Sequence, residues 1–259
     1  MSAEAPCAPQ RQPTPWLCIG CGWAAYLGPV QQNRPHNHHM VQIVWSSAAP
    51  VWMASTSGDA PARGHVVAAD ASHHLRAEGP LCLLFLDPEL DAAESWKRYA
   101  AGAVRTLADG QVQQLGAAFS SWHSAGAQQI AVSPTLDERR RALITWLGER
   151  LPEPLRARDA AAAVGLAESH FLHWFSQVHG LTFRPYVRWL RVQHVLRNLA
   201  TGLNLAAAAH AAGFADSAHL SRTFVATFGI SPRQLQHTRI ELRVTNGPDL
   251  STVSLAHPR

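Results

Sequence analysis

The sequence predicts an α+β protein in which a small β-barrel precedes an all-α segment with two helix-turn-helix units. Three observations predict this fold class. Short runs rich in β-branched and aromatic residues, separated by Gly, Pro, Asn and Asp, fill residues 15–90, which is typical of a barrel or sandwich. Amphipathic helical patterns begin at Asp91. The pattern of residues 160–180 then recurs at residues 206–229, so the helical segment contains an internal repeat.

The composition is that of a folded globular protein. Hydrophobic residues make up 47% of the 259 residues and charged residues 15%, whereas disordered chains are more highly charged. No apolar run approaches the roughly 20 residues that span a membrane. The first residues lack the charged start and apolar stretch of a secretory signal, so we expect a cytoplasmic protein without membrane contact. Four cysteines are too few for a disulfide framework.

The chain divides into five expected segments. These are a disordered Pro- and Ala-rich tail at 1–14, a sensor or effector domain at 15–90, a helical connector and candidate dimerisation region at 91–134, a double helix-turn-helix DNA-binding domain at 135–240 and a flexible tail at 241–259. The predicted strands of the sensor domain are Trp16–Leu27, Met40–Ser46, Val51–Ser55, His65–Ala69, His74–Ala77 and Leu81–Leu86.

Helical periodicity predicts two helices in the connector, Ala92–Ala101 and Gly110–His123. A third helix is expected to follow Thr135, which is a candidate N-cap. Asp137 and Glu138 then suit the first turn, because acidic side chains are favourable at a helix N-terminus.

Each copy of the repeat has the residue pattern of a helix-turn-helix unit. Each begins with four consecutive alanines, and such small residues let a second helix cross closely. A glycine that tolerates positive φ follows, and the two glycines, Gly165 and Gly213, lie 48 residues apart. The next residue, Leu166 or Phe214, is expected to fill the gap between the helices.

The second helix of each unit is predicted to be two-faced. Its buried positions are Phe171, Trp174, Phe175 and Val178 in the first unit and Leu220, Phe224 and Phe228 in the second. Asp216 is a candidate cap of the second such helix, and Thr182 of the connecting helix. That connecting helix, Phe183–Leu199, is about 25 Å long. With the flanking helices, it is expected to hold two recognition helices about one DNA turn, roughly 34 Å, apart.

Positive charge is concentrated in the predicted DNA-binding segment. Residues 135–240 contain 13 basic and 7 acidic residues, a net charge of +6. Residues 1–134 contain 7 basic and 9 acidic residues, a net charge of −2. A basic segment of this kind is the electrostatic footprint of nucleic-acid binding, and the alternative is an all-α bundle without a DNA role.

The segment GFADSAHLSRTFVATFGISP (213–232) closely resembles the signature of AraC/XylS-type transcription regulators, and the resemblance covers about residues 135–240, including PYVRWLR (185–191). It implies a regulator that binds promoter DNA. By this resemblance the candidate base-edge contacts are Ser169, Leu172, His173, Ser217, Ala218, His219, Ser221 and Arg222. The candidate phosphate contacts are Thr182, Arg184 and Arg188.

Among these residues, Arg222 is the strongest candidate for base recognition, because arginine pairs bidentately with guanine in the major groove. Its alternative role is a phosphate clamp or a surface ion pair. The sequence departs from the family at Ala167, where a capping Ser is usual. Leu172 is also apolar at an expected base-facing position. We therefore expect the second unit to provide more of the sequence-specific hydrogen bonding.

The N-terminal domain of such regulators is often a cupin-like β-barrel that binds an effector or dimerises, and HNHH (36–39) followed by HH (73–74) resembles that class. His36, His38 and His73 or His74 are candidate ligands of a divalent metal, since imidazoles suit Zn, Cu, Ni or Fe. The acidic ligand of metal cupins is missing, and Gln42 stands near its place. The alternative function is a metal-binding cupin, either a metal sensor or a metalloenzyme.

The remaining expectations concern the cysteines, catalysis and the partners. Cys18 and Cys21 are a further candidate metal or redox pair, but on a strand their side chains point to opposite faces. The protein is expected not to be an enzyme and to need no cofactor other than that metal. Its expected partners are double-stranded promoter DNA, an unknown small-molecule or metal effector, RNA polymerase if it activates transcription, and a second copy of the chain in a homodimer.

Overall fold

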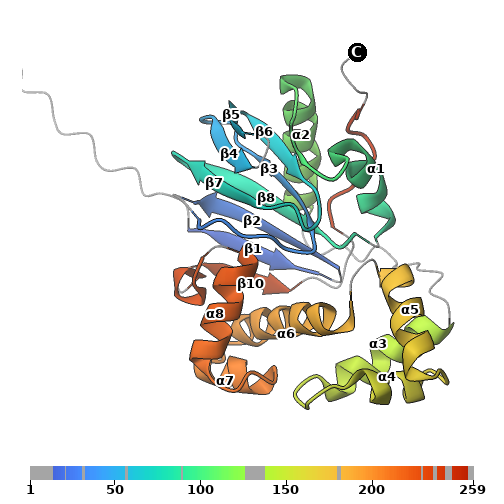
Figure 1. Cartoon of the computed structure of the whole chain (residues 1–259). Coiled ribbons are helices and arrows are strands. Elements are labelled where there is room, and N and C mark those ends of the chain that lie inside the picture. The colour runs from blue at the N-terminus through green and yellow to red at the C-terminus, as the bar shows by residue number, and fades with distance from the viewer. Residues whose placement is uncertain are drawn as a thin grey trace, which may run out of the picture.

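The computed structural model describes residues 14–20, 22–30, 33–55, 58–88, 90–125, 138–179, 182–228, 230–235, 238–242 and 247–255. In it a sheet-rich N-terminal region packs against a helical C-terminal region (Figure 1). The predicted α+β class, with strands first and helix-turn-helix units after them, is confirmed. Among the helices in these ranges, none is both long enough and apolar enough to cross a membrane.

Two sheets form the N-terminal region in the described part of the chain. The larger has the strand order β10-β1-β2-β8-β3-β6-β9 and the smaller has the order β5-β4-β7. Neighbours run antiparallel except β10 and β1, which are parallel. The strands are β1 (Trp16–Ile19), β2 (Trp23–Pro29), β3 (Val41–Trp45), β4 (Val51–Ser55), β5 (Gly58–Ala62), β6 (Gly64–Val67), β7 (His73–Ala77), β8 (Pro80–Leu86), β9 (Val104–Thr106) and β10 (Arg239–Leu242).

Alternate residues of the larger sheet enter two different cores. On β3, Ile43 and Trp45 pack in a core shared with α1 (Asp91–Ala100) and α2 (Asp109–Ser124). Val44 packs in a second core, between the two sheets. All five residues of β3 are buried, as expected of a strand covered on both faces. The N-terminal region therefore has three layers: the small sheet, the large sheet and the helices (Figure 1).

The predicted strands need one correction, and three strands were missed. Residues Trp16–Leu27 form two strands, because Gly22 adopts a φ of +74° and the Gly20 N–H bonds to the carbonyl oxygen of Trp23 at 3.0 Å. The missed strands are β5, β9 and β10. β5 has the sequence GDAPA, which has no β-branched residue to favour a strand. β10 forms only because β1, more than 200 residues away in sequence, pairs with it.

The expected connector and flexible tail are both part of the N-terminal core. Trp96 of α1 and Leu115 of α2 are completely buried against the larger sheet. Leu250 and Val253 are buried in the same core, and Gln111 Nε2 donates to the carbonyl oxygen of Ser254 at 2.9 Å. The prediction of a flexible tail was therefore wrong for residues 247–255, because two apolar side chains in an irregular segment leave no periodic pattern. Residues 1–13 and Thr135 lie outside the described ranges.

The helical region follows the predicted order closely. Its elements are α3 (Glu138–Arg150), α4 (Ala157–Ala163), α5 (Glu168–His179), α6 (Phe183–Ala200), α7 (Leu205–Ala211), α8 (Ser217–Phe228) and the 3-10 helix η1 (Pro232–Leu235). Phe171 and Phe175 of α5 are completely buried in a core made by α3 to α6. Leu220 and Phe224 of α8 are buried in a core that also includes Leu17 of β1. The first unit thus has its own core, and the second shares one with the sheet.

The glycines of the two turns provide a test of this packing. Gly165 and Gly213 have φ values of +69° and +77°, at which an L residue costs about 1–2 kcal/mol. An added Cβ at Gly213 would also lie 2.8 Å from the carbonyl oxygen of Pro152, whereas at Gly165 it would meet no atom within 4 Å beyond its chain neighbours. We expect Gly213→Ala to reduce the free energy of unfolding by at least about 1 kcal/mol more than Gly165→Ala. Urea denaturation measures both losses, and equal losses would contradict the close approach at Gly213.

Candidate nucleic-acid interface and histidine cluster

The two helix-turn-helix units are built alike. α4 and α5 form the first and α7 and α8 the second, and both turn glycines have the predicted positive φ. Phe214 is buried and Leu166 is half-buried in the cores of their units. α6 has 18 residues, or about 27 Å, and α5 and α8 lie near its opposite ends (Figure 1). The two recognition helices are therefore held apart by a rigid element.

The recognition helices differ at their N-termini. Asp216 Oδ1 accepts a hydrogen bond from the backbone N–H of His219 at 2.6 Å, which is the predicted cap of α8. Ala167 occupies the matching position before α5 and has no side-chain acceptor, so only its carbonyl oxygen takes part, bonded to the N–H of Phe171. A capping Asp stabilises a helix by about 1 kcal/mol relative to Ala. α8 is thus the better anchored at the end that enters DNA in such motifs.

The candidate base-contacting residues lie on the open faces of α5 and α8. Those that are exposed are Ser169, Leu172, His173, Ser217, Ala218 and Arg222. His219 and Ser221 are half-buried. The His219 ring packs 5.2 Å from that of Phe214, and the Ser221 hydroxyl donates to the carbonyl oxygen of Ser217 at 2.8 Å. The side chains of His219 and Ser221 therefore already make contacts within their own unit, and only part of each is exposed to a ligand.

Exposed cations accompany these faces. Arg222 forms no ion pair with any residue in the described ranges, so its guanidinium is available to a ligand. Arg184 and Arg188, which are also exposed, lie in the first turns of α6. Thr182 stands at the N-cap of α6 but makes no side-chain capping bond, contrary to expectation. Its hydroxyl therefore remains available to an anion at the start of this helix.

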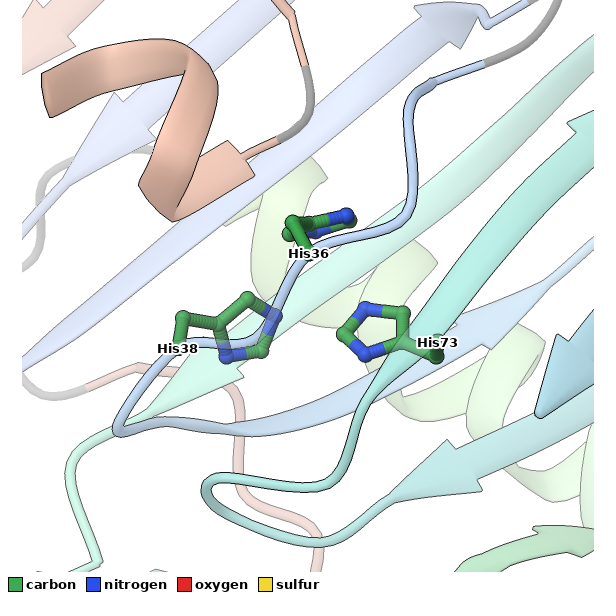
Figure 2. Close-up of side chains that lie close together, drawn as sticks. All are labelled: His36, His38 and His73. Carbon is green, nitrogen blue, oxygen red and sulfur yellow. The ribbon is translucent and has the colours of Figure 1, made fainter. Parts of the chain in front are cut away.

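Three of the four candidate metal ligands meet in one buried cluster (Figure 2). His36 and His38 come from the segment before β3, and His73 begins β7. One ring nitrogen from each lies within 4.8 Å of those of the other two. His36 and His73 are also joined by two backbone hydrogen bonds of 3.0 Å. His74 is next along β7 and points away, because successive side chains of a strand face opposite sides.

Hydrogen bonds fix the orientation of the three imidazoles. Each Nδ1 donates to a backbone carbonyl oxygen, those of Arg34, Met40 and Ala71, at 2.8, 3.1 and 2.9 Å respectively. Each proton therefore sits on Nδ1, and each Nε2 presents a lone pair, which is the usual arrangement of metal-binding histidines. Nε2 of His73 is buried and has no hydrogen-bond partner in the described part of the chain.

Nε2 of His38 also has a polar neighbour outside the cluster, the side chain of Gln42. It lies 2.8 Å from Gln42 Oε1. The single proton of neutral His38 is on Nδ1, and two acceptors cannot share a hydrogen bond, so a bond here requires the Gln42 amide to be turned over so that its NH₂ donates to Nε2. A metal at Nε2 would displace this bond, so Gln42 competes with the metal rather than replacing the acidic ligand.

Burial keeps the cluster neutral. Loss of hydration, together with neighbouring histidines, lowers the pKa of His36 to about 4 and that of His38 to about 3. Burial also lowers the pKa of His73. Neutral imidazole is the metal-binding form. The donor set therefore fits a divalent transition metal held by three nitrogens, and no carboxylate of the described residues joins them.

Two other features of the N-terminal region are separate from the cluster. Cys18 is completely buried in the core beneath α1 and α2, and Cys21 lies outside the described residues. A groove of about 660 Å³ lies beside α2, with Trp45, Phe119 and Arg63 in its lining. All the residues that line it belong to the N-terminal region, so it does not border the helix-turn-helix units.

Sequence reasoning missed the polar contacts that join the two regions. His39 Nδ1 bonds to Asp70 Oδ2 at 2.8 Å, and His39 Nε2 bonds to the carbonyl oxygen of His179 at 3.3 Å. Burial alone would lower the pKa of His39, but the bond to Asp70 and its charge outweigh burial and raise that pKa. Asn33 Nδ2 donates to the carbonyl oxygen of Phe228 at 3.4 Å. No local pattern marks these residues, because their partners are distant in sequence.

Comparison with known proteins supports this description of the helical region. A family model described as a helix-turn-helix domain matches residues 160–238. An uncharacterized HTH-type transcriptional regulator of Escherichia coli, YpdC, is 27% identical over 100 residues, which are 38% of this chain. The matched stretch spans only 35% of the length of that relative.

Solved structures of similar fold cover most of the chain. An apo form of a ToxT variant from Vibrio cholerae covers 83% of this chain and 96% of its own, with a TM-score of 0.54 and 12% identity. Wild-type ToxT bound to an unsaturated fatty acid covers 87% of this chain and 96% of its own, with a TM-score of 0.51 and 12% identity. At this identity the likeness concerns the fold.

The geometry and these comparisons define a class: the chain has a sheet-rich N-terminal region followed by a DNA-binding domain with two helix-turn-helix units. Residues 160–238 match a helix-turn-helix domain, and part of the chain is similar to an HTH-type transcriptional regulator. The family resemblance of residues 213–232 is thereby confirmed.

Arg222→Ala is expected to weaken binding to the preferred duplex by about 1–3 kcal/mol and to relax the preference at one base pair. Arg188→Ala is the matched control, since loss of a phosphate contact weakens binding to all duplexes alike and reduces the salt slope by about one. Anisotropy titrations with the preferred duplex and its single-base variants separate the two effects. Unchanged affinity and base preference in Arg222→Ala would refute its role.

Proposed function

We propose that the protein is a sequence-specific transcription regulator that inserts α5 and α8 into two successive major-groove segments of promoter DNA. The observation that carries this proposal is the pair of exposed polar recognition faces at opposite ends of α6. The net charge of +6 on residues 135–240 favours the same partner. Because the AraC-type domain is only part of the chain, the activity of the whole protein rests on this proposal.

Selection from random duplexes tests the proposal directly. The full chain should enrich a sequence with two conserved blocks about one helical turn, roughly 10 base pairs, apart. Hydroxyl-radical footprinting on that duplex should show two protected segments on one face, and affinity should fall steeply with salt. Enrichment of one block only, or of none, would contradict readout by two helices.

We further propose that the N-terminal region receives an effector. ToxT, which has a similar fold, has been solved with an unsaturated fatty acid, and a small molecule is therefore one candidate. The groove beside α2 offers it a place. We also assign α2 a role in forming a homodimer, since Gln113, Gln114 and Ala117 leave one side of it exposed. RNA polymerase is a further partner if the protein activates transcription.

A divalent transition metal is the second candidate effector, and the convergence of three neutral imidazoles favours it. His36, His38 and His73 would hold the ion through Nε2, while their Nδ1 bonds keep the rings in place. The cluster lies close to the DNA-binding domain, because Phe85 packs against both His38 and Phe228 of α8. We assign the metal a sensing role and no catalytic step.

The Zn²⁺ affinities of two variants should distinguish a histidine that binds the metal from a neighbouring histidine that does not. His73→Ala is expected to weaken Zn²⁺ affinity by at least about 100-fold, since loss of an outer-sphere partner alone costs about 10- to 100-fold. His74→Ala is the matched control on the same strand and should retain the affinity. Competition with a chromophoric chelator measures both. Equal affinities of the two variants would refute the cluster as the binding site.

A further inference from the structure

The segment that carries two of the three histidines also touches the C-terminal ends of both recognition helices. We define residues 33–40 as the bridging segment. We propose that metal binding at His36, His38 and His73 is thermodynamically linked to DNA binding, because the bridging segment sets the relative placement of α5 and α8. This inference rests on the proposed DNA-binding function and on the metal site, and it adds the route between them.

The first contact joins the bridging segment to the first unit. His39 Nε2 donates to the carbonyl oxygen of His179 at 3.3 Å, and Asp70 accepts from Nδ1 of the same ring at 2.8 Å. His179 is the last residue of α5. His39 directly follows the cluster residue His38, so movement of one displaces the other. Among the described residues, the core of the first unit includes none from the sheets, so this hydrogen bond adds a direct polar tie to the attachment that α6 makes through its packing on β1 and β10.

The second contact joins the segment to the second unit. Asn33 Nδ2 donates to the carbonyl oxygen of Phe228 at 3.4 Å, while Asn33 Oδ1 accepts from the backbone N–H of Leu75 at 2.6 Å. The His38 ring lies 5.3 Å from the Phe85 ring, and the Phe85 ring lies 5.9 Å from that of Phe228. Phe228 ends α8. The cluster is thus packed onto the second recognition helix through a single intervening ring.

The third contact anchors the end of the segment. Met40 is completely buried, and it packs in the core that contains Trp189 of α6 and Phe224 of α8. Its carbonyl oxygen also accepts the hydrogen bond from Nδ1 of His38. One residue therefore supports both a ligand of the cluster and the core of the second unit.

These contacts leave the DNA-binding faces open. They involve the last residues of α5 and α8, whereas the base-contact candidates lie at and near the beginnings of these helices. The bridging segment therefore restrains the positions of the recognition helices and leaves their base-contact candidates uncovered.

Metal binding would tighten this restraint. A transition metal lies about 2.0–2.1 Å from each imidazole nitrogen, so the ligand nitrogens must be at most about 4.2 Å apart. The three nitrogens lie within 4.8 Å of one another, so at most a small adjustment brings them into this range, and His38 must also leave Gln42. Fixing His36 and His38 to His73 orders the bridging segment and so reduces the conformational entropy that DNA binding must otherwise remove. We therefore expect the metal to strengthen DNA binding.

The test measures Zn²⁺ and DNA binding to the full chain in both orders. The DNA is the duplex selected from random sequence by the same chain. Saturating Zn²⁺ should tighten DNA binding by about 5- to 150-fold, and DNA should tighten Zn²⁺ binding by the same factor. Unchanged or weaker DNA binding with Zn²⁺ bound would overturn the inference while leaving the metal site intact. Absence of Zn²⁺ binding, or of any selected duplex, would instead refute the proposals on which it rests.

Variants locate the route. His39→Ala keeps all three ligands but removes the bond to His179, so it should bind Zn²⁺ and DNA separately while losing most of the linkage. Asp70→Asn removes only the charge that orients His39. This milder variant should lose part of the linkage between Zn²⁺ binding and DNA binding. His210→Ala, at an exposed position on α7, is the matched control and should keep the full linkage. Thermal unfolding verifies that each variant is folded, and full linkage in both His39→Ala and Asp70→Asn would overturn the route.

Discussion

The pairing of β10 with β1 is the interaction on which the arrangement of the two regions depends. β1 opens the N-terminal sheet and β10 follows the second helix-turn-helix unit, yet they form a parallel ladder from Trp16 and Arg239 to Ile19 and Leu242. Parallel strands require a long connection between them, and here the whole DNA-binding domain lies within that connection. The ladder therefore attaches the second unit to the sheet and directs residues 247–255 back to the N-terminal core.

This attachment makes the two units unequal. The second unit shares its core with Leu17 and Ile19 of β1, and its recognition helix has a capping Asp216. The first unit has a separate core, and Ala167, which precedes its recognition helix, provides no side-chain cap. Burial of apolar surface against a sheet restrains a helix more strongly than one polar contact can. The first unit is accordingly the part whose placement a small change in the bridging segment can alter.

The histidine cluster shows how burial and hydrogen bonding together prepare a binding site. Buried polar groups are costly unless they are bonded, and the three Nδ1 atoms meet this requirement through backbone carbonyl oxygens. The same bonds direct Nε2 of His73 into the protein, where it has no partner in the described part of the chain. His38 adjoins His39 and packs on Phe85. Metal binding at the cluster can therefore affect the positions of both recognition helices.

The sequence by itself determined the helix-turn-helix units, the turn glycines Gly165 and Gly213 and the Asp216 cap, because these depend on residues a few positions apart. It also supplied the candidate histidines, but not the choice between His73 and His74. That choice follows from the register of β7, which places His73 on the inner face with Leu75. The tertiary structure alone decided the partner of β10, the burial of Leu250 and the contacts of Asn33 and His39. Each of these contacts joins segments far apart in the chain. Local periodicity does not predict which distant segment will cover a residue.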